Sequence, residues 1–287
     1  MANRLLTVHG GITMAKKKKA PGKQERVNTL FDNISTLSKI IGEESNWVMG
    51  IDPGRTSPGI AFQVMHADSQ KPIVEKFSIN TKLKGFGKVI EVESWFLQHI
   101  QMKHPGFIVM EDYSFDSEYG REKAGEMGGV LKRAIWLRSI PLITVAPQSD
   151  KAFIGVMKKE EIMKEVLRKW LIDTSKSDEA DAIVLAKIGA GIAKLVRAGI
   201  MIADNDERKE FEASAHKFVS LEQQEAKTLV NLLINRGDTV YEYARGKEKA
   251  REAQRKQKQT KGRTDSSNKA SKKPNKKTSK KASGTTS

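Results

Sequence analysis

The sequence contains no cysteine, which excludes disulfide bonds and thiolate-ligated metal centres. This composition suits the reducing cytoplasm. No apolar run approaches the roughly 20 residues that cross a bilayer, so we expect no membrane partner. The N-terminal stretch lacks the hydrophobic region of a secretory signal. The five histidines are scattered along the chain, which disfavours a histidine metal site.

Positive charge is concentrated at the two ends of the chain. The 287 residues carry a net charge of +16. Residues 245–287 contain 16 Lys and Arg against 3 Asp and Glu, and residues 1–26 contain 7 against 1, so the 218 residues between them carry −3. Lysine-rich segments attract polyanions whatever their sequence. We therefore expect both ends to bind nucleic acid and to raise its affinity, around a nearly neutral folded body.

Composition and apolar patterning divide the chain into four regions. Residues 1–45 form a basic arm with a short helix, and residues 46–203 carry the alternating apolar runs of an α/β domain. Residues 204–244 are predicted to be a helical extension. Residues 245–287 have too few apolar side chains to offset the entropy of ordering, so we predict a disordered, Lys-rich tail.

Within the α/β region the patterning predicts the order βββαβαβ, followed by helices. The expected strands are Trp47–Asp52, Gly59–Met65, Pro72–Ile79, Gly106–Asp112 and Pro141–Ala146. The expected helices are Lys88–Lys103, Gly125–Ser139, Lys159–Ile172 and Ser177–Ile200. Three consecutive strands followed by alternating units imply one mixed five-stranded sheet with helices on both faces.

Four carboxylates fall where this fold would bring the strand ends together. Asp52 and Glu111 each end an apolar strand, and Asp178 and Asp181 share one face at the start of a helix. Gathered in one place, four carboxylates would repel one another unless cations bound between them. Oxygen ligands of this kind favour Mg²⁺ or Mn²⁺. Taken singly, each aspartate also fits a turn or helix-start residue, so spacing alone leaves both interpretations open.

Several blocks between Trp47 and Ala190 carry a resemblance to a known family. They are GIDPGRTSPGIA, FIVMEDYSF, GEMGGVLKRAIWLRSIPLITVAPQSDKAFIG, KKEEI and SDEADAIVLA. Together they resemble the RuvC family of Holliday-junction resolvases, and the RuvC-like enzymes of bacteriophages in particular. The resemblance implies an RNase H-like fold, a homodimer, and two Mg²⁺ ions per active site, for which Mn²⁺ would substitute. It assigns the metal ligands to four residues, Asp52, Glu111, Asp178 and Asp181.

The same resemblance assigns further residues near these acids. Lys151 matches the first of two essential lysines, and Lys158 and Lys159 both fit the second. An ammonium group beside the scissile phosphate would offset the charge that builds up in the transition state. Tyr113 and Phe115 both fit an aromatic residue that stacks on the bases of the opened junction. Ordinary packing or surface roles also fit these five residues.

The prediction from sequence is a Mg²⁺-dependent, structure-selective endodeoxyribonuclease that resolves Holliday junctions by paired symmetric nicks. It would act in the cytoplasm of a prokaryote or of a phage-infected host. One alternative is a nuclease that removes flaps and branches from phage DNA before packaging. Another is a DNA-binding protein that retains an RNase H-like fold without catalysis.

An ATPase of the actin and Hsp70 superfamily is disfavoured, because no second glycine-rich phosphate loop with an acid is found in the sequence. The segment GAG at Gly189–Gly191 lies inside a helical pattern and is no dinucleotide fingerprint. We therefore expect no nucleotide cofactor.

Overall fold

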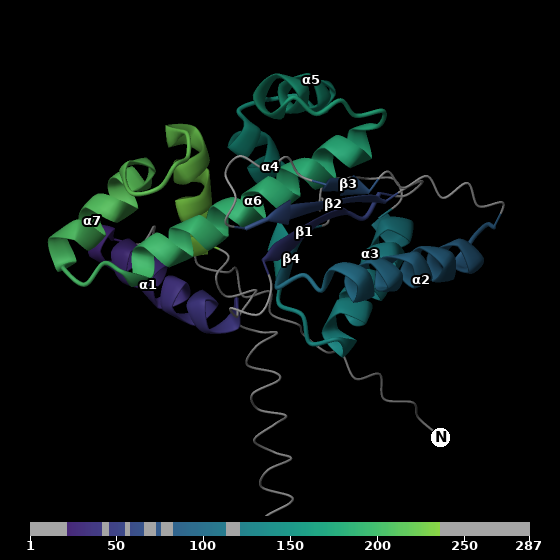
Figure 1. Cartoon of the computed structure of the whole chain (residues 1–287), viewed down its shortest axis with the longest axis horizontal. Coiled ribbons are helices and arrows are strands. Elements are labelled where there is room, and N and C mark those ends of the chain that lie inside the picture. Colours follow the sequence, from purple (N-terminus) through teal and green to yellow (C-terminus); the bar gives the residue numbers. More distant parts are fainter. Residues whose placement is uncertain are drawn as a thin grey trace, which may run out of the picture.

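The computed structural model describes residues 22–41, 46–54, 58–65, 73–75, 83–112 and 121–235 (Figure 1). The strands are β1 (Trp47–Asp52), β2 (Gly59–Val64), β3 (Ile73–Glu75), β4 (Phe107–Glu111) and β5 (Leu142–Val145). The helices are α1 (Lys23–Ile40), α2 (Phe86–Lys103), α3 (Arg121–Leu137), α4 (Pro147–Ile154), α5 (Lys159–Trp170), α6 (Ser177–Ile200) and α7 (Asn205–Ser214). A short 3₁₀ turn (Ala215–Lys217) and a helical segment, residues 223–235, follow α7.

The strands form one mixed sheet in the order β3-β2-β1-β4-β5. The β1–β2 and β2–β3 pairs are antiparallel, whereas β1, β4 and β5 run parallel. The predicted mixed α/β architecture is confirmed. The strand expected at Pro72–Ile79 is described only at Ile73–Glu75, and the rest of it lies outside the described residues.

Helices cover both faces of the sheet (Figure 1). α2 and α3 lie on one face, over a core that contains Met49 and Ile51 of β1. α6 crosses the other face, over a second core that contains Val48. This division follows the alternation of side chains along a strand. Every helix in the described ranges is too short or too polar to cross a membrane.

The N-terminal helix and the C-terminal extension, which the sequence presents as separate regions, pack together on the second half of α6. Arg26 of α1 pairs with Glu212 of α7 at 2.9 Å, and its guanidinium also donates to Asn231 at 3.0 Å. The buried amide of Asn33 donates to the Leu233 carbonyl oxygen at 2.7 Å. These segments share the core beneath α6, so both are part of the folded body.

Helix α4 was not predicted from the sequence. It begins immediately after β5, with Pro147 at a first-turn position where a missing backbone N–H costs nothing. Its eight residues include only two large apolar side chains that are buried, Phe153 and Ile154. This is too short a pattern to distinguish a helix from a loop.

Glycines allow α6 to lie directly against the sheet. A Cβ atom added to Gly50 of β1 would overlap the backbone of α6 at Ala182 and Ala186. A Cβ atom added to Gly59 of β2 would overlap the backbone carbonyl of Asp178. The first turns of α6 are therefore held at a fixed height above the ends of β1 and β2.

Gly50→Ala should push α6 off the sheet and lower the free energy of unfolding by about 1–3 kcal/mol, the usual cost of overpacking. The matched control is Gly129→Ala on α3, where an added Cβ meets no atom within 4 Å. This control should be neutral or should stabilise by up to about 1 kcal/mol, because alanine favours a helix. Urea unfolding measures both changes. Equal stability of Gly50→Ala and wild type would contradict the close packing of α6.

Candidate metal centre

Asp52 ends β1 and faces α6. Val48, four positions earlier, packs in the core beneath α6, and alternation along the strand puts Asp52 on the same face. Only 4% of Asp52 is exposed. A carboxylate is thus buried at the point where the sheet meets the first turn of α6.

Glu111 ends β4 and lies beside Asp52. The two strands are parallel with Ile51 opposite Met110, so the next pair in this register is Asp52 and Glu111. Phe107 and Val109 belong to the core beneath α6. Because side chains alternate along a strand, Glu111 lies on the same face of the sheet as Asp52. The two carboxylates are therefore neighbours at the ends of adjacent strands, and the charge of Glu111 raises the pKa of Asp52.

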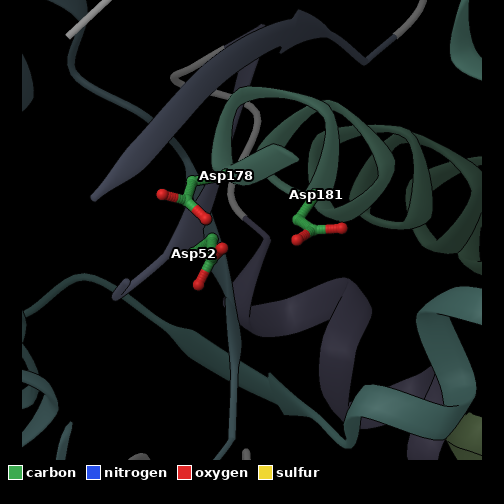
Figure 2. Close-up of side chains that lie close together, drawn as sticks. All are labelled: Asp52, Asp178 and Asp181. Atoms are coloured by element: carbon green, nitrogen blue, oxygen red, sulfur yellow. The ribbon is translucent and has the colours of Figure 1, made fainter. Parts of the chain in front are cut away.

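Asp178 and Asp181 come from the first turn and a half of α6. Together with Asp52 they place one carboxylate oxygen each within 4.8 Å of one another. Figure 2 shows the three side chains gathered between α6 and the end of β1. Asp181 is 3% exposed, whereas Asp178 lies nearer the rim. Glu111 adjoins this group of three through Asp52.

The group is electrostatically strained without a cation. Burial raises the pKa of Asp52 well above its usual value, and the charges of Glu111, Asp181 and Asp178 raise it further. Burial and the charge of Asp181 raise the pKa of Glu111. Burial also raises the pKa of Asp181. A bound cation would lower the pKa values of all three carboxyl groups.

Lys159 is the second of the two adjacent lysines and contacts the acids directly. Its Nζ lies 2.9 Å from Asp181 Oδ2 and 3.8 Å from Asp178 Oδ1. Burial alone would lower the pKa of Lys159, but its hydrogen bond to Asp181 and the surrounding carboxylates raise it above the usual value. Its side chain is still 48% exposed. Lys159 therefore reaches both the acids and the solvent.

The other two lysines take different positions. Lys158 precedes α5 and is exposed, and its backbone N–H donates to the Glu161 carboxylate at 3.3 Å. Lys151 lies on α4, and its charge lowers the pKa of both Glu111 and Asp181. The structure therefore brings Lys159 into contact with the acids, whereas Lys151 acts on them only through its charge.

The aromatic candidates Tyr113 and Phe115 lie outside the described residues.

The residues present fit a hard divalent cation. Asp181 Oδ1 is buried and has no hydrogen-bond partner among the described residues. The donor set of Asp52, Asp178 and Asp181 consists of carboxylate oxygens, which Mg²⁺ and Mn²⁺ prefer. These three residues could hold one ion, with Glu111 beside them.

Asp150 is a buried acid that the sequence reasoning did not consider. It lies on α4, is 2% exposed, and accepts a hydrogen bond from the Lys151 backbone N–H at 2.6 Å. Burial, followed by the charge of Glu111, raises its pKa to about 7. The spacing of Asp150, Phe153 and Ile154 is the one signal that could have placed this acid on a buried helical face.

Comparison with known proteins finds solved structures that resemble this chain. The chain is similar to RuvC of Thermus thermophilus. One RuvC structure aligns at 20% sequence identity and a TM-score of 0.42, covering 54% of this chain and 96% of that one. RuvC in complex with a Holliday junction substrate aligns at 21% identity and a TM-score of 0.41, covering 54% and 95%. No protein-family model and no curated protein matches the chain.

Metal binding and protonation should compete at this centre, and Asp52→Asn tests the competition. When folding raises the pKa of a carboxyl group, protonation of that group stabilises the folded state. This stabilisation is complete at pH values below the pKa in the unfolded chain, near 4, and is lost as the pH rises through the pKa in the folded state. In EDTA, Asp52→Asn should therefore be more stable than wild type at a pH of about 8, and this difference should shrink toward a pH of about 5. Thermal melts across this range measure it.

Mg²⁺ provides the second arm of the same experiment. It should raise the melting temperature of wild type, because a ligand of the folded state alone stabilises by about 2.7 kcal/mol at 100 times its dissociation constant. The Asp52→Asn protein should respond far less. Equal Mg²⁺ shifts in the two proteins would remove Asp52 from the metal centre.

Proposed function

We propose that this protein is a Mg²⁺-dependent, structure-selective endodeoxyribonuclease that resolves four-way DNA junctions. The observation that carries the proposal is the convergence of Asp52, Asp178 and Asp181 from distant parts of the sequence, with Glu111 at the end of the strand next to that of Asp52. The sequence resemblance to RuvC resolvases and the basic ends of the chain support DNA as the substrate. The complete set of carboxylates argues against a DNA-binding protein without catalysis.

Each acid has a defined part in this proposal. Asp52, Asp178 and Asp181 would hold one Mg²⁺ ion, and Glu111, beside Asp52, would help to hold a second. When bound, a pair of such ions would activate water for in-line attack and stabilise the leaving oxygen of a phosphodiester. The carboxylates come from the sheet and from α6, two rigid elements, so they hold their positions without rearrangement.

Lys159 is the lysine that we assign to the scissile phosphate. Its ammonium group is anchored by Asp181 and is partly open to solvent, so a DNA phosphate at the rim can contact it. There it would offset negative charge that develops on the phosphate during cleavage. Lys151, on the Glu111 side, would add to the same positive field.

A four-way junction has two opposed strands to cut, and one chain contains one such centre among its described residues. We therefore propose a homodimer in which each protomer nicks one strand, as the family resemblance implies. The segments 1–21 and 236–287, which contain most of the excess lysine, would increase DNA affinity through counterion release. Structure selectivity would then come from the spacing of the two centres.

Cleavage of labelled DNA tests the proposal. With Mg²⁺, wild type should cut opposed strands of a four-way junction in preference to three-way, flap and linear DNA, and EDTA should abolish cutting. Asp52→Asn should bind the junction normally but cut it at least about 1,000-fold more slowly. Asp206→Asn, which removes an exposed charge on α7, is the matched control and should behave as wild type. Cutting in EDTA, or near-normal cutting by Asp52→Asn, would refute the mechanism.

The two adjacent lysines offer a matched pair of variants. Lys159→Gln should lower the cleavage rate by about 100- to 1,000-fold, the usual effect of removing one group that stabilises transition-state charge. Lys158→Gln should stay close to wild type, because this lysine is exposed and precedes the helix that positions its neighbour. Single-turnover rates on the junction measure both. A larger loss in Lys158→Gln would reverse the assignment.

A further inference from the structure

The helical segment 223–235 contacts both of the helices that carry the candidate lysines. Lys151 lies on α4 and Lys159 begins α5, and these two helices follow one another between β5 and α6. The segment packs directly on α6, because a Cβ atom added to Gly191 would overlap the side chain of Leu229. Leu229 is fully buried in the core beneath α6. The segment is therefore a fixed part of the folded body against which α4 and α5 can be held.

An ion-pair cluster joins α5 to the start of this segment. Lys169, in the last turn of α5, places its Nζ 3.1 Å from Glu225 Oε1 and 2.7 Å from Glu222 Oε2. The side chains of Lys169 and Glu225 are only 8% and 10% exposed, so this pair is shielded from solvent. Removing one partner of a shielded pair leaves the other charge without compensation, which is costly. The pair should therefore hold the end of α5 firmly.

Glu225 connects the ion pair to the backbone of its own helix. Its second carboxylate oxygen, Oε2, accepts a hydrogen bond from the Glu222 backbone N–H at 3.3 Å, at the point where the segment begins. A carboxylate in the first turn of a helix that reaches back to the preceding residue is half of a capping box, and the helix dipole favours it there. Both oxygens of Glu225 are thus engaged, one by α5 and one by the start of the segment.

The same segment also binds the end of α4. Gln224 Nε2 donates to the Ala152 carbonyl oxygen at 3.2 Å, and the Thr228 hydroxyl lies 3.5 Å from the same oxygen. Carbonyl groups in the last turn of a helix have no partner within the helix, so a side chain from elsewhere can satisfy them. Ala152 directly follows Lys151 in the chain. This contact therefore holds the turn of α4 that carries Lys151.

The position of Lys159 depends on the orientation of α5 as a whole. The buried residues of α5 are Ile162 and Val166, which lie one turn apart on one face of the helix. Lys159 and Lys169 lie at opposite ends of α5, about 15 Å apart along its axis. Because the helix is rigid, a tilt permitted at Lys169 would also move Lys159, whose Nζ lies 2.9 Å from Asp181 Oδ2.

We propose that Lys169 and Glu225 are positioning residues through which the segment 223–235 holds α5, so that Lys159 stays in contact with Asp181. This inference rests on the proposed function for its catalytic consequence, because there Lys159 acts on the scissile phosphate. The C-terminal extension then serves the metal centre without contacting it. The contact between Gln224 and Ala152 would act in the same way on α4.

Acylation of the full-length protein by acetic anhydride, resolved for each lysine by mass spectrometry, tests the contact without DNA. Lys169→Met should make Lys159 react about 10-fold faster, because loss of the Asp181 contact lowers the pKa of Lys159 and raises the share of its reactive neutral form. Glu225→Gln should have the same effect. Lys217→Met, which breaks an exposed ion pair with Glu210 in the same extension, is the matched control and should leave Lys159 as in wild type.

Single-turnover cleavage of a four-way junction with Mg²⁺ adds the catalytic measurement. Lys169→Met should cut about 10- to 100-fold more slowly, since a small displacement of a group that acts on the reacting atoms has an effect of this size. Lys169→Arg, which can keep the ion pair, should cut close to wild type. In a Lys159→Gln background, Lys169→Met should have no further effect, because the group that it displaces is already absent.

The outcomes separate this inference from the proposed function. Unchanged reactivity of Lys159 in folded Lys169→Met and Glu225→Gln proteins would overturn the positioning role and leave the nuclease proposal standing. An equal loss of cutting with and without Lys159 would also overturn it, because a merely structural role affects both backgrounds alike. If wild type cut no DNA while both variants exposed Lys159, the proposed function would fail and the positioning of Lys159 would stand.

Thermal melts in EDTA establish which variants are folded at the temperature of the assay. Glu225→Gln retains the size of the side chain and a carbonyl acceptor for the Glu222 N–H. It therefore carries the test on its own if Lys169→Met does not fold.

Discussion

The packing of α6 against the sheet is the contact on which the rest of the molecule depends. Gly50 and Gly59 remove the side chains that would otherwise separate the helix backbone from β1 and β2. The helix supplies two of the acids, and the sheet supplies Asp52 and Glu111. A helix displaced by one side-chain thickness would carry Asp178 and Asp181 away from Asp52. The two glycines therefore help to set the distance between the carboxylates of α6 and those of the sheet.

This packing also holds charges together that repel one another. Burial and neighbouring acids raise the pKa of Asp52, and Lys159 is the nearest cation to Asp181. A core of apolar residues from β1, β4, α4, α5 and α6 packs beneath α6 and extends to α1 and the C-terminal helices. Functional sites commonly carry such local strain at the expense of stability elsewhere. Helices α1 and α7 and residues 223–235, at the C-terminal end of α6, enlarge the apolar core whose packing offsets this loss of stability.

The sequence predicted those features that depend on local pattern. β1 and β4 are buried runs that each end in an acid, and the i, i+3 spacing of Asp178 and Asp181 requires only a helix. Which of Lys158 and Lys159 reaches the acids was open, because it depends on how α5 packs against α6 and not on where α5 begins. Helix α4 was missed because eight residues with two buried apolar side chains give a weak period, and Asp150 was missed with it. The packing of α1 on α6 involves Ile34 and Gly199, residues too far apart in sequence for any local pattern to connect.

The distribution of charge links the centre to the ends of the chain. An uncompensated group of buried carboxylates repels a DNA phosphate, whereas the same group with divalent cations attracts it. Under the proposed function, DNA held by the basic ends alone would not be drawn into the centre until cations were present. The coupling is reciprocal: a phosphate at the rim must strengthen cation binding by the same factor by which cations strengthen phosphate binding. Lys159 is ion-paired with Asp181 and open to solvent, so under the proposed function it would contact both the metal centre and the DNA phosphate.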